Sequence, residues 1–366
     1  MDIRHLMKVD DFFNTASKYI SFAAINPLRS AVIEKEFFRN KKDPHFIYSP
    51  TNPKLNRLKE LIRDIKVDDS PLGDLLFDKR DDLINKINMI QNRGNNKEFT
   101  KNIVKIYGKP DKKLVNKAYE ILTTTERKKE KKLISSAKAI LLFRQAVNDF
   151  KCNWNVEKRD QPATADADHI TKTLFIKNNA RFSVHFVKRL IIHEVGTHIL
   201  CAENGLLQPY KIFYYGTANY LKSEEGLAVF NEDKFGVLYT NALRNYACRV
   251  IAADSILKNS FIETFNKLKI YLPDKAAFRL TLSAKRGAGD TSEPGGCTKG
   301  MVYLKGYLEL KELEQKGADL SWLYYGKIAH EYLDIYPKLP GLIKPKYKIE
   351  NLKVLKPKSS ELKKII

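Results

Sequence analysis

The spacing of apolar residues predicts that the first 150 residues are mainly helical. Apolar side chains recur every three or four positions in a series of segments, several of which end at a glycine or a proline. These segments cover residues 10–24, 55–65, 75–90, 99–106, 114–123 and 135–152. The charge run 126–132 is expected to be a solvated helix face. We therefore predict a helical N-terminal unit comprising residues 1–150.

The pattern changes after this boundary. Threonine and apolar residues alternate over 171–177, which predicts a strand, and Ser183 can cap a helix that continues into 189–200. Helical patterns return over residues 223–234, 237–257, 301–316 and 319–335. The predicted fold class is α+β, mostly helical with a small sheet, in which a second unit spans 151–340 and a basic C-terminal tail spans 341–366.

Composition and charge narrow the class of protein. The chain has 366 residues and 43% apolar content, enough for two globular units, and 65 basic against 43 acidic residues leave a net charge of +22. Such a surface attracts acidic partners, but the lysines are spread along the chain, so a dedicated nucleic-acid site is not expected. No apolar run is long enough for a signal peptide or a membrane span, and the four cysteines are far apart. A cytoplasmic protein without disulfides is the expectation.

The stretch 189–200 carries the candidate chemistry. His193 and His198 lie on one apolar segment with Glu194 beside the first, which is how a protein holds a catalytic zinc ion next to a general base. The histidines are five positions apart, so a regular helix would separate their directions by about 140°. We therefore predict a widened turn, a π-bulge, at residues 195–197, with Gly196 as the residue that tolerates it. The strand 171–177 is then expected to be the edge strand that aligns a substrate peptide.

A catalytic zinc site needs a third protein ligand, commonly a carboxylate on a following helix. Glu224 and Glu225 stand about thirty residues after the histidines, at the start of a predicted helix. Spacing alone leaves both of them open as the ligand.

These motifs resemble those of the tyrosine/phenylalanine carboxypeptidase family, which includes the microtubule-associated tyrosine carboxypeptidases and bacterial proteins with a Gln-Glu-Gly-Leu-Ala motif. The likeness rests on His193-Glu-Val-Gly-Thr-His198 and Glu224-Glu-Gly-Leu-Ala228, and it extends over roughly residues 25–335. Shorter matches lie at 99–100, 107–110, 180–182 and 285–287. The resemblance implies Zn²⁺ as cofactor, Glu225 as the third ligand and a zinc metallopeptidase core in the second unit. It also implies removal of a C-terminal Tyr or Phe, with Glu194 as general base on a zinc-bound water. Glu224 replaces the Gln of the family motif.

The substrate is then expected to be a peptide or protein C-terminus, and the net charge is compatible with an acidic one. Its carboxylate needs a cation, and we predict Lys285 and Arg286, with Arg244 and Arg249 as rivals. A donor for the reaction's oxyanion is also needed, and Tyr220 is one of several candidates. The other candidates are Tyr214, Tyr215, Tyr239 and Tyr246. The alternatives are a zinc endopeptidase or aminopeptidase on the same site, or a basic binding protein with a vestigial metal site.

Overall fold

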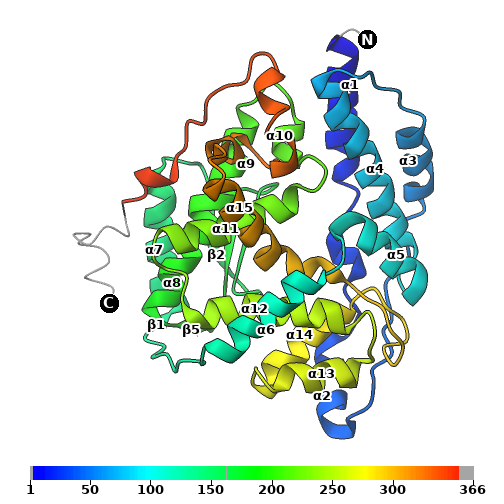
Figure 1. Ribbon diagram of the computed structural model, residues 1–366, viewed down its shortest axis with the longest axis vertical. Coiled ribbons are helices and arrows are strands. Elements are labelled where there is room, and N and C mark those ends of the chain that lie inside the picture. The colour runs from blue at the N-terminus through cyan, green and yellow to red at the C-terminus, as the bar shows by residue number, and fades with distance from the viewer. Residues whose placement is uncertain (1–2, 162, 354–366) are drawn as a thin grey trace. The chain divides into compact units, whose positions relative to one another are not determined.

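The computed structural model describes residues 3–161 and 163–353, and Figure 1 shows the course of the chain. The chain divides into two compact units, and both are discontinuous in sequence. The first unit combines the residues up to 126 with 241–305, and the second combines 127–240 with the residues from 306 onward. This division differs from the predicted boundary near residue 150, because helices distant in sequence complete the first unit.

The first unit is helical. Its helices are α1 (Ile3–Ser17), α2 (Ser30–Asn40), α3 (Lys54–Arg63), α4 (Pro71–Gln91), α5 (Asn96–Tyr107), α6 (Lys112–Thr124), α12 (Thr240–Ser255), α13 (Phe261–Lys269) and α14 (Asp274–Lys285), with short 3-10 turns at Phe22–Ile25 and Thr298–Met301. An aromatic cluster joins its two parts: the ring centroid of Phe37 in α2 lies 5.1 Å from that of Phe261, 4.9 Å from Phe265 and 5.1 Å from Phe278. These rings bury a large apolar area between segments more than 200 positions apart, which explains why the unit is not contiguous.

Three predicted helices differ from those observed. The helix predicted over 319–335 is absent, and that range forms the short 3-10 turns Leu320–Tyr325 and His330–Tyr332 instead. The helix predicted over 10–24 begins earlier and ends at Ser17, and a separate 3-10 turn follows at Phe22–Ile25. The charge run 126–132 is not helical, although it is largely exposed as expected. Five cations within residues 127–132 would repel one another at helical spacing, which disfavours a helix there.

The second unit contains all the strands and a central set of helices. Its elements are β1 (Ile134–Ser135), α7 (Ser136–Asp149), β2 (Asn155–Arg159), β3 (Ala165–Asp168), β4 (Thr173–Lys177), β5 (Arg181–Phe182), α8 (Val184–Leu190), the π-helix η2 (Ile191–Ile199), α9 (Leu200–Leu206), α10 (Ile212–Tyr215) and α11 (Tyr220–Lys234). The later elements are α15 (Val302–Gln315), which begins in the first unit, and 3-10 turns η4 (Leu320–Tyr325), η5 (His330–Tyr332), η6 (Tyr336–Lys338) and η7 (Ile349–Asn351). A mostly helical α+β fold with a small sheet is thereby confirmed.

The sheet has the order β2-β4-β3, with β2 parallel and β3 antiparallel to β4, and β1 pairs separately with β5. The predicted strand 171–177 is therefore real but lies in the middle of the sheet, so the prediction that it is the edge strand is wrong. The edge beside η2 belongs to β3, which is short and acidic and contacts the π-helix. Strand order depends on pairing between distant segments, and periodicity does not carry it.

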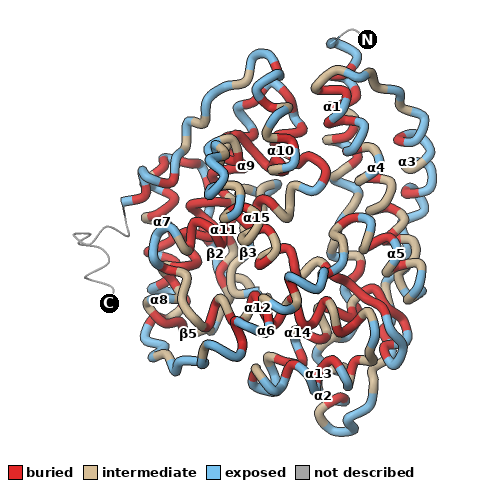
Figure 2. Tube along the Cα trace, viewed as in Figure 1, coloured by how far each residue is buried: buried red, intermediate tan, exposed pale blue. Residues whose placement is uncertain are grey.

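The apolar core of the second unit joins η2 to α7, α8 and the strands β2 and β4. Helix α11 packs against η2 (Figure 2). Ten consecutive residues of α11, Ser223–Glu232, are buried, so this helix has no solvent face over that length. Ile349 and Leu352, from the segment predicted to be a basic tail, are 3% and 5% exposed and belong to the same core. The rest of that predicted tail, 354–366, lies outside the described residues. In the part of the chain that is described, no helix combines the length and the apolar character needed to cross a bilayer.

Candidate metal centre

The π-helix η2 continues α8 and leads into α9, so the stretch 189–200 is one helix with a widened middle. The predicted widening at 195–197 is confirmed, and it extends over the whole of Ile191–Ile199. The hydroxyl of Thr197 donates to the carbonyl oxygen of Ile192, five positions earlier, at 3.2 Å. The extra residue per turn brings the rings of His193 and His198 to the same side, with their centroids 5.0 Å apart.

Gly196 also has a packing role in this helix. A Cβ atom at this position would lie 2.8 Å from the Cδ1 atom of Ile349, closer than carbon atoms approach one another. The glycine therefore makes room for η7 to pack against the widened turn. That the glycine also tolerates the widened backbone stays a prediction.

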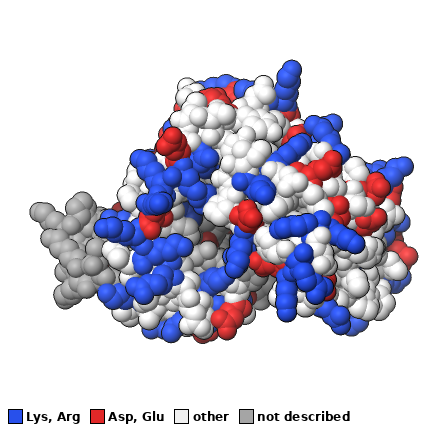
Figure 3. Space-filling view, turned by 90° about the horizontal axis from the view of Figure 1, so that it is seen from below, with Lys and Arg blue, Asp and Glu red and all other residues white. Residues whose placement is uncertain are grey.

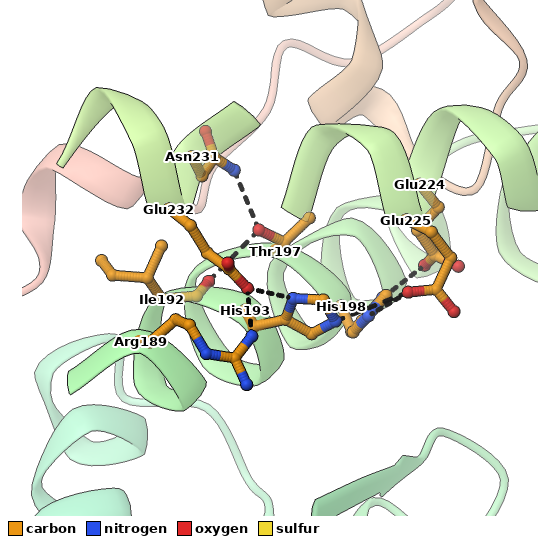
Figure 4. Close-up of polar contacts among 9 residues, drawn as sticks. All are labelled: Arg189, Ile192, His193, Thr197, His198, Glu224, Glu225, Asn231 and Glu232. Carbon is orange, nitrogen blue, oxygen red and sulfur yellow. Dashed lines mark hydrogen bonds and ion pairs between the residues drawn. The ribbon is translucent and has the colours of Figure 1, made fainter. Parts of the chain in front are cut away.

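Helix α11 supplies the acidic residues. It packs against η2 and also approaches α15 closely at Gly226, where a Cβ atom would lie 2.5 Å from the carbonyl carbon of Gly306. Oε2 of Glu225 lies 3.4 Å from Nε2 of His193 and 3.6 Å from Nε2 of His198 (Figure 4). Glu224 instead faces the other ring nitrogen of His198, with Oε1 3.5 Å from Nδ1. The structure thus brings Glu225, rather than Glu224, to the side shared by both histidines.

The residues present fit a zinc ion. One ligand atom each from His193, His198 and Glu225 lies within 4.8 Å of the others. A tetrahedral zinc ion with bonds of about 2.0–2.1 Å holds its ligand atoms roughly 3.3–3.4 Å apart, close to the nitrogen–oxygen separations above. The electrostatics agree: burial opposes ionisation of His198, but Glu224 and Glu225 outweigh it and raise its pKa well above the usual value. The pocket therefore favours positive charge.

A third carboxylate of α11, that of Glu232, contacts the ring nitrogen of His193 that faces away from Glu225. Glu232 is fully buried, and its Oε1 lies 2.7 Å from Nδ1 of His193 and 2.7 Å from Nη1 of Arg189, which donates to it (Figure 4). If Nδ1 carries the proton and donates it to Glu232, Nε2 is left with its lone pair directed at Glu225. Sequence reasoning missed this contact, although a signal exists. Glu232 follows Glu225 by two helical turns, and Arg189 precedes His193 by one turn.

Replacing Glu232 with glutamine is expected to lower the affinity for zinc about 10- to 100-fold, because the histidine ligand loses an anionic hydrogen-bond acceptor. The affinity can be measured by competition with a chromogenic chelator. Glu203→Gln is a matched control, since Glu203 is also buried but bonds Trp154 and Lys172 instead. Equal zinc affinities for Glu232→Gln and the unaltered protein would contradict the positioning role.

Glu194 is buried beside this centre, with an exposed fraction of 8%. Burial raises the pKa of its carboxyl group, and His193 and His198 oppose the rise. Asp166 of β3 is another charge that acts on it, and β3 contacts η2. A buried carboxylate that adjoins a metal ligand in sequence is a candidate general base of a peptidase.

The predicted substrate-binding cations have other environments. Lys285 and Arg286 belong to the first unit. Lys285 is fully buried, burial lowers its pKa to about 8, and its ammonium group donates to the carbonyl oxygens of Asn259 at 2.8 Å and Glu293 at 2.6 Å. Arg286 lies 4.5 Å above the ring of Phe22. These contacts hold the glycine-rich loop and give no support to a substrate-binding role for Lys285.

The remaining candidates are also engaged. Arg244 donates to the carbonyl oxygen of Leu122 at 2.8 Å, and Arg249 lies 4.7 Å above the ring of Tyr303. The ring of Tyr220, at the start of α11, packs on Gly216, where a Cβ atom would lie 2.4 Å from its Cδ1.

Two histidines and a glutamate that converge from neighbouring helices, with a second glutamate beside the first histidine, are typical of a mononuclear metallopeptidase. Comparison with known proteins narrows this class. The chain belongs to the microtubule-associated tyrosine carboxypeptidase family, whose sequence model matches residues 35–365. The resemblance inferred from the motifs is thereby confirmed.

Individual relatives match over a shorter region. The "Putative tyrosine carboxypeptidase MATCAP2" of Mus musculus is 32% identical over 160 residues, 41% of this chain and 30% of the relative. Its Homo sapiens counterpart is 32% identical over 168 residues, 43% of this chain and 30% of the relative. "Microtubule-associated tyrosine carboxypeptidase 1" of Mus musculus is 32% identical over 136 residues, 34% of this chain and 28% of the relative. The chain thus spans less than a third of the length of these relatives.

Proposed function

We propose that this protein is a zinc-dependent metallocarboxypeptidase that removes a C-terminal Tyr or Phe from peptides or proteins. The observation that carries the proposal is the convergence of Glu225 Oε2 on the Nε2 atoms of His193 and His198, at 3.4 and 3.6 Å, next to the buried Glu194. Membership of the family and the names of the relatives support the choice of a C-terminal aromatic residue.

The residues divide the chemistry between them. His193, His198 and Glu225 would hold the zinc ion, which when bound lowers the pKa of water and polarises a carbonyl group. Glu194 takes a proton from the attacking water and returns it to the amine that leaves. Glu232 and Arg189 keep the ring of His193 in one orientation throughout.

Strand β3 is suited to align the substrate. The amide of Lys177 in β4 donates to the carbonyl oxygen of Thr164, and Asp166 is paired with Phe175. Because inward and outward groups alternate along a strand, the N–H and C=O groups of Ala165 and Ala167 lie on the outer edge. An extended peptide can add to that edge beside Glu194.

The substrate's own charge is also part of the proposal. The face drawn in Figure 3 carries scattered lysines and arginines that outnumber the acidic residues, in keeping with the net charge of +22. Such a surface attracts an acidic protein C-terminus over long range, and the scatter gives no track for nucleic acid.

A library of peptides with varied C-termini, analysed by mass spectrometry, tests this function. We expect release of a single Tyr or Phe from peptides with a free C-terminal carboxylate, and no release after treatment with a zinc chelator. Restoration of activity by added zinc is the control for chelation. Internal cleavage or loss of N-terminal residues would identify an endopeptidase or an aminopeptidase. A fully metal-loaded protein that cleaves none of the peptides would favour the binding protein with a vestigial site.

A further inference from the structure

A peptidase restricted to C-termini must recognise the terminal carboxylate, and the inference here rests on the function proposed above. Two cations of the second unit, Arg189 and Lys172, are already engaged by carboxylates. Arg189 donates to Glu232 at 2.7 Å, and Lys172 pairs with Glu203 at 2.8 Å. We propose that Lys327 is the residue that binds the carboxylate of the substrate's last residue.

The backbone around Lys327 is held firmly in place. Its N–H group donates to the carbonyl oxygen of Phe213 at 2.7 Å, and its carbonyl oxygen accepts from the N–H group of Thr217 at 3.1 Å. The preceding residue, Gly326, lies so close to Phe213 that a Cβ atom would be 2.2 Å from the same oxygen. The side chain of Lys327 therefore projects from a backbone segment that is fixed by its contacts. A residue that discriminates one ligand group from another needs such a fixed position.

Backbone contacts place the segment of Lys327 beside the start of α11 and the end of the edge strand. Three residues after Lys327, the N–H group of His330 donates to Oγ of Ser223, the residue before Glu224, at 2.8 Å. Phe213, which bonds the backbone of Lys327, is followed by Tyr214, whose hydroxyl donates at 2.9 Å to the carbonyl oxygen of His169, one residue beyond β3. In keeping with this position, burial lowers the pKa of Lys327, and Glu224 and Asp168 oppose the change.

What distinguishes Lys327 is that the residue is buried while its ammonium group has no close partner among the described residues. The residue is 6% exposed, and no hydrogen bond or ion pair of this group occurs within the described residues. The two other lysines with similar burial are satisfied: Lys79 pairs with Asp82 at 2.9 Å, and Lys285 bonds two carbonyl oxygens. A cation without a counter-ion in a largely desolvated site is destabilising. A carboxylate brought by a ligand would remove most of that cost.

The competing explanation is that Lys327 only balances the charge of Glu224. That explanation predicts the same loss of affinity for every ligand when Lys327 is removed, since the whole site would be altered. A carboxylate-binding role predicts a selective loss, because only a ligand with a free C-terminal carboxylate would lose a charge-assisted hydrogen bond. The two explanations therefore differ in the ratio of affinities for a peptide acid and its amide.

The experiment compares N-acetyl-Ala-Ala-Tyr with its C-terminal amide, by calorimetry on zinc-loaded Glu194→Gln protein, in which cleavage is suppressed. We expect the acid to bind roughly 10- to 100-fold more tightly than the amide, the range that a charge-assisted hydrogen bond provides. Adding Lys327→Met should reduce this preference to less than about threefold with the amide affinity kept, since the amide never used the charge. Lys234→Met removes the same charge from an exposed position on α11 and should leave the preference unchanged.

Zinc content measured on each variant separates a metal defect from a ligand defect. An unchanged preference for the acid in the Lys327→Met protein would overturn the inference, and so would loss of the amide together with the acid. These outcomes are distinct from failure of the proposed function, which would show as wild-type protein that releases no C-terminal residue from either Tyr- or Phe-terminated peptides.

Discussion

Replacing Glu194 with glutamine is expected to lower kcat for release of a C-terminal Tyr by roughly 100- to 10,000-fold, the range over which general acid–base groups contribute. Glutamine has nearly the same shape but cannot accept the proton of the attacking water. The substitution also leaves the three predicted zinc ligands in place. The zinc content of the purified protein should therefore remain at one ion per chain, and the loss should fall on kcat rather than on binding. Steady-state kinetics and elemental analysis of the same preparation measure both quantities.

The matched control for this substitution is Glu203→Gln, which removes a buried carboxylate from the same unit and away from the ligands. Its kcat should stay within a few-fold of the wild-type value. A Glu194→Gln protein that retains zinc and full activity would rule out Glu194 as the base. In that case the exposed carboxylate of Asp166 and the buried carboxylate of Glu224 would need to be tested next.

The second large effect is expected at Glu225. Glu225→Gln should lower zinc affinity by more than about 100-fold, beyond what is typical for an outer partner of a ligand, and abolish activity at ordinary zinc concentrations. Glu224→Gln should keep its zinc, because its carboxylate faces Nδ1 of His198 and not the shared side of the two rings. Glu225→Gln and Glu224→Gln are the same chemical change at adjacent positions of one helix. A difference in zinc affinity between them therefore reflects the position of each carboxylate alone.

Thermal denaturation provides an independent measurement of the same site. A ligand that binds only the folded chain stabilises it, by about 4 kcal/mol at a concentration 1,000 times its dissociation constant. Added zinc should therefore raise the Tm of the wild-type and Glu224→Gln proteins after chelator treatment, but not that of Glu225→Gln. The reverse pattern would make Glu224 the third ligand and contradict the assignment.

The spacing of the two histidines shows which part of the site could be predicted from the local sequence. Five positions between His193 and His198 are incompatible with a shared metal on a regular helix, and that angular argument required the widened turn which η2 contains. The helical segments of the first 150 residues were predictable for the same reason, since the 3.6-residue period is a local property. The ends of helices were harder to predict: α1 ends at Ser17, whereas the predicted helix continued to residue 24.

The division into units could not be predicted from periodicity. Phe37 clusters with residues of 261–278 only because α13 and α14 pack against the N-terminal helices. The local pattern of either segment does not predict that the two are in contact. The place of 171–177 inside the sheet has the same origin. Its alternating pattern predicted a strand correctly, but the neighbours of a strand are decided by pairing at a distance.

By itself, the sequence predicted the helical character of the chain, the widened helix and the candidates His193, Glu194 and His198, because spacing along a helix defines the direction of each side chain. The choice of Glu225 over Glu224 came from the family resemblance and not from spacing. Only the tertiary structure decided that β3 is the edge strand and that Ile349 is what Gly196 accommodates. It also brought Glu232 to His193 and placed the segment of the buried Lys327 against the start of α11, through the bond of His330 to Ser223. Those relations join residues between 39 and 153 positions apart, and burial and charge pairing between such residues arise only when the chain is packed.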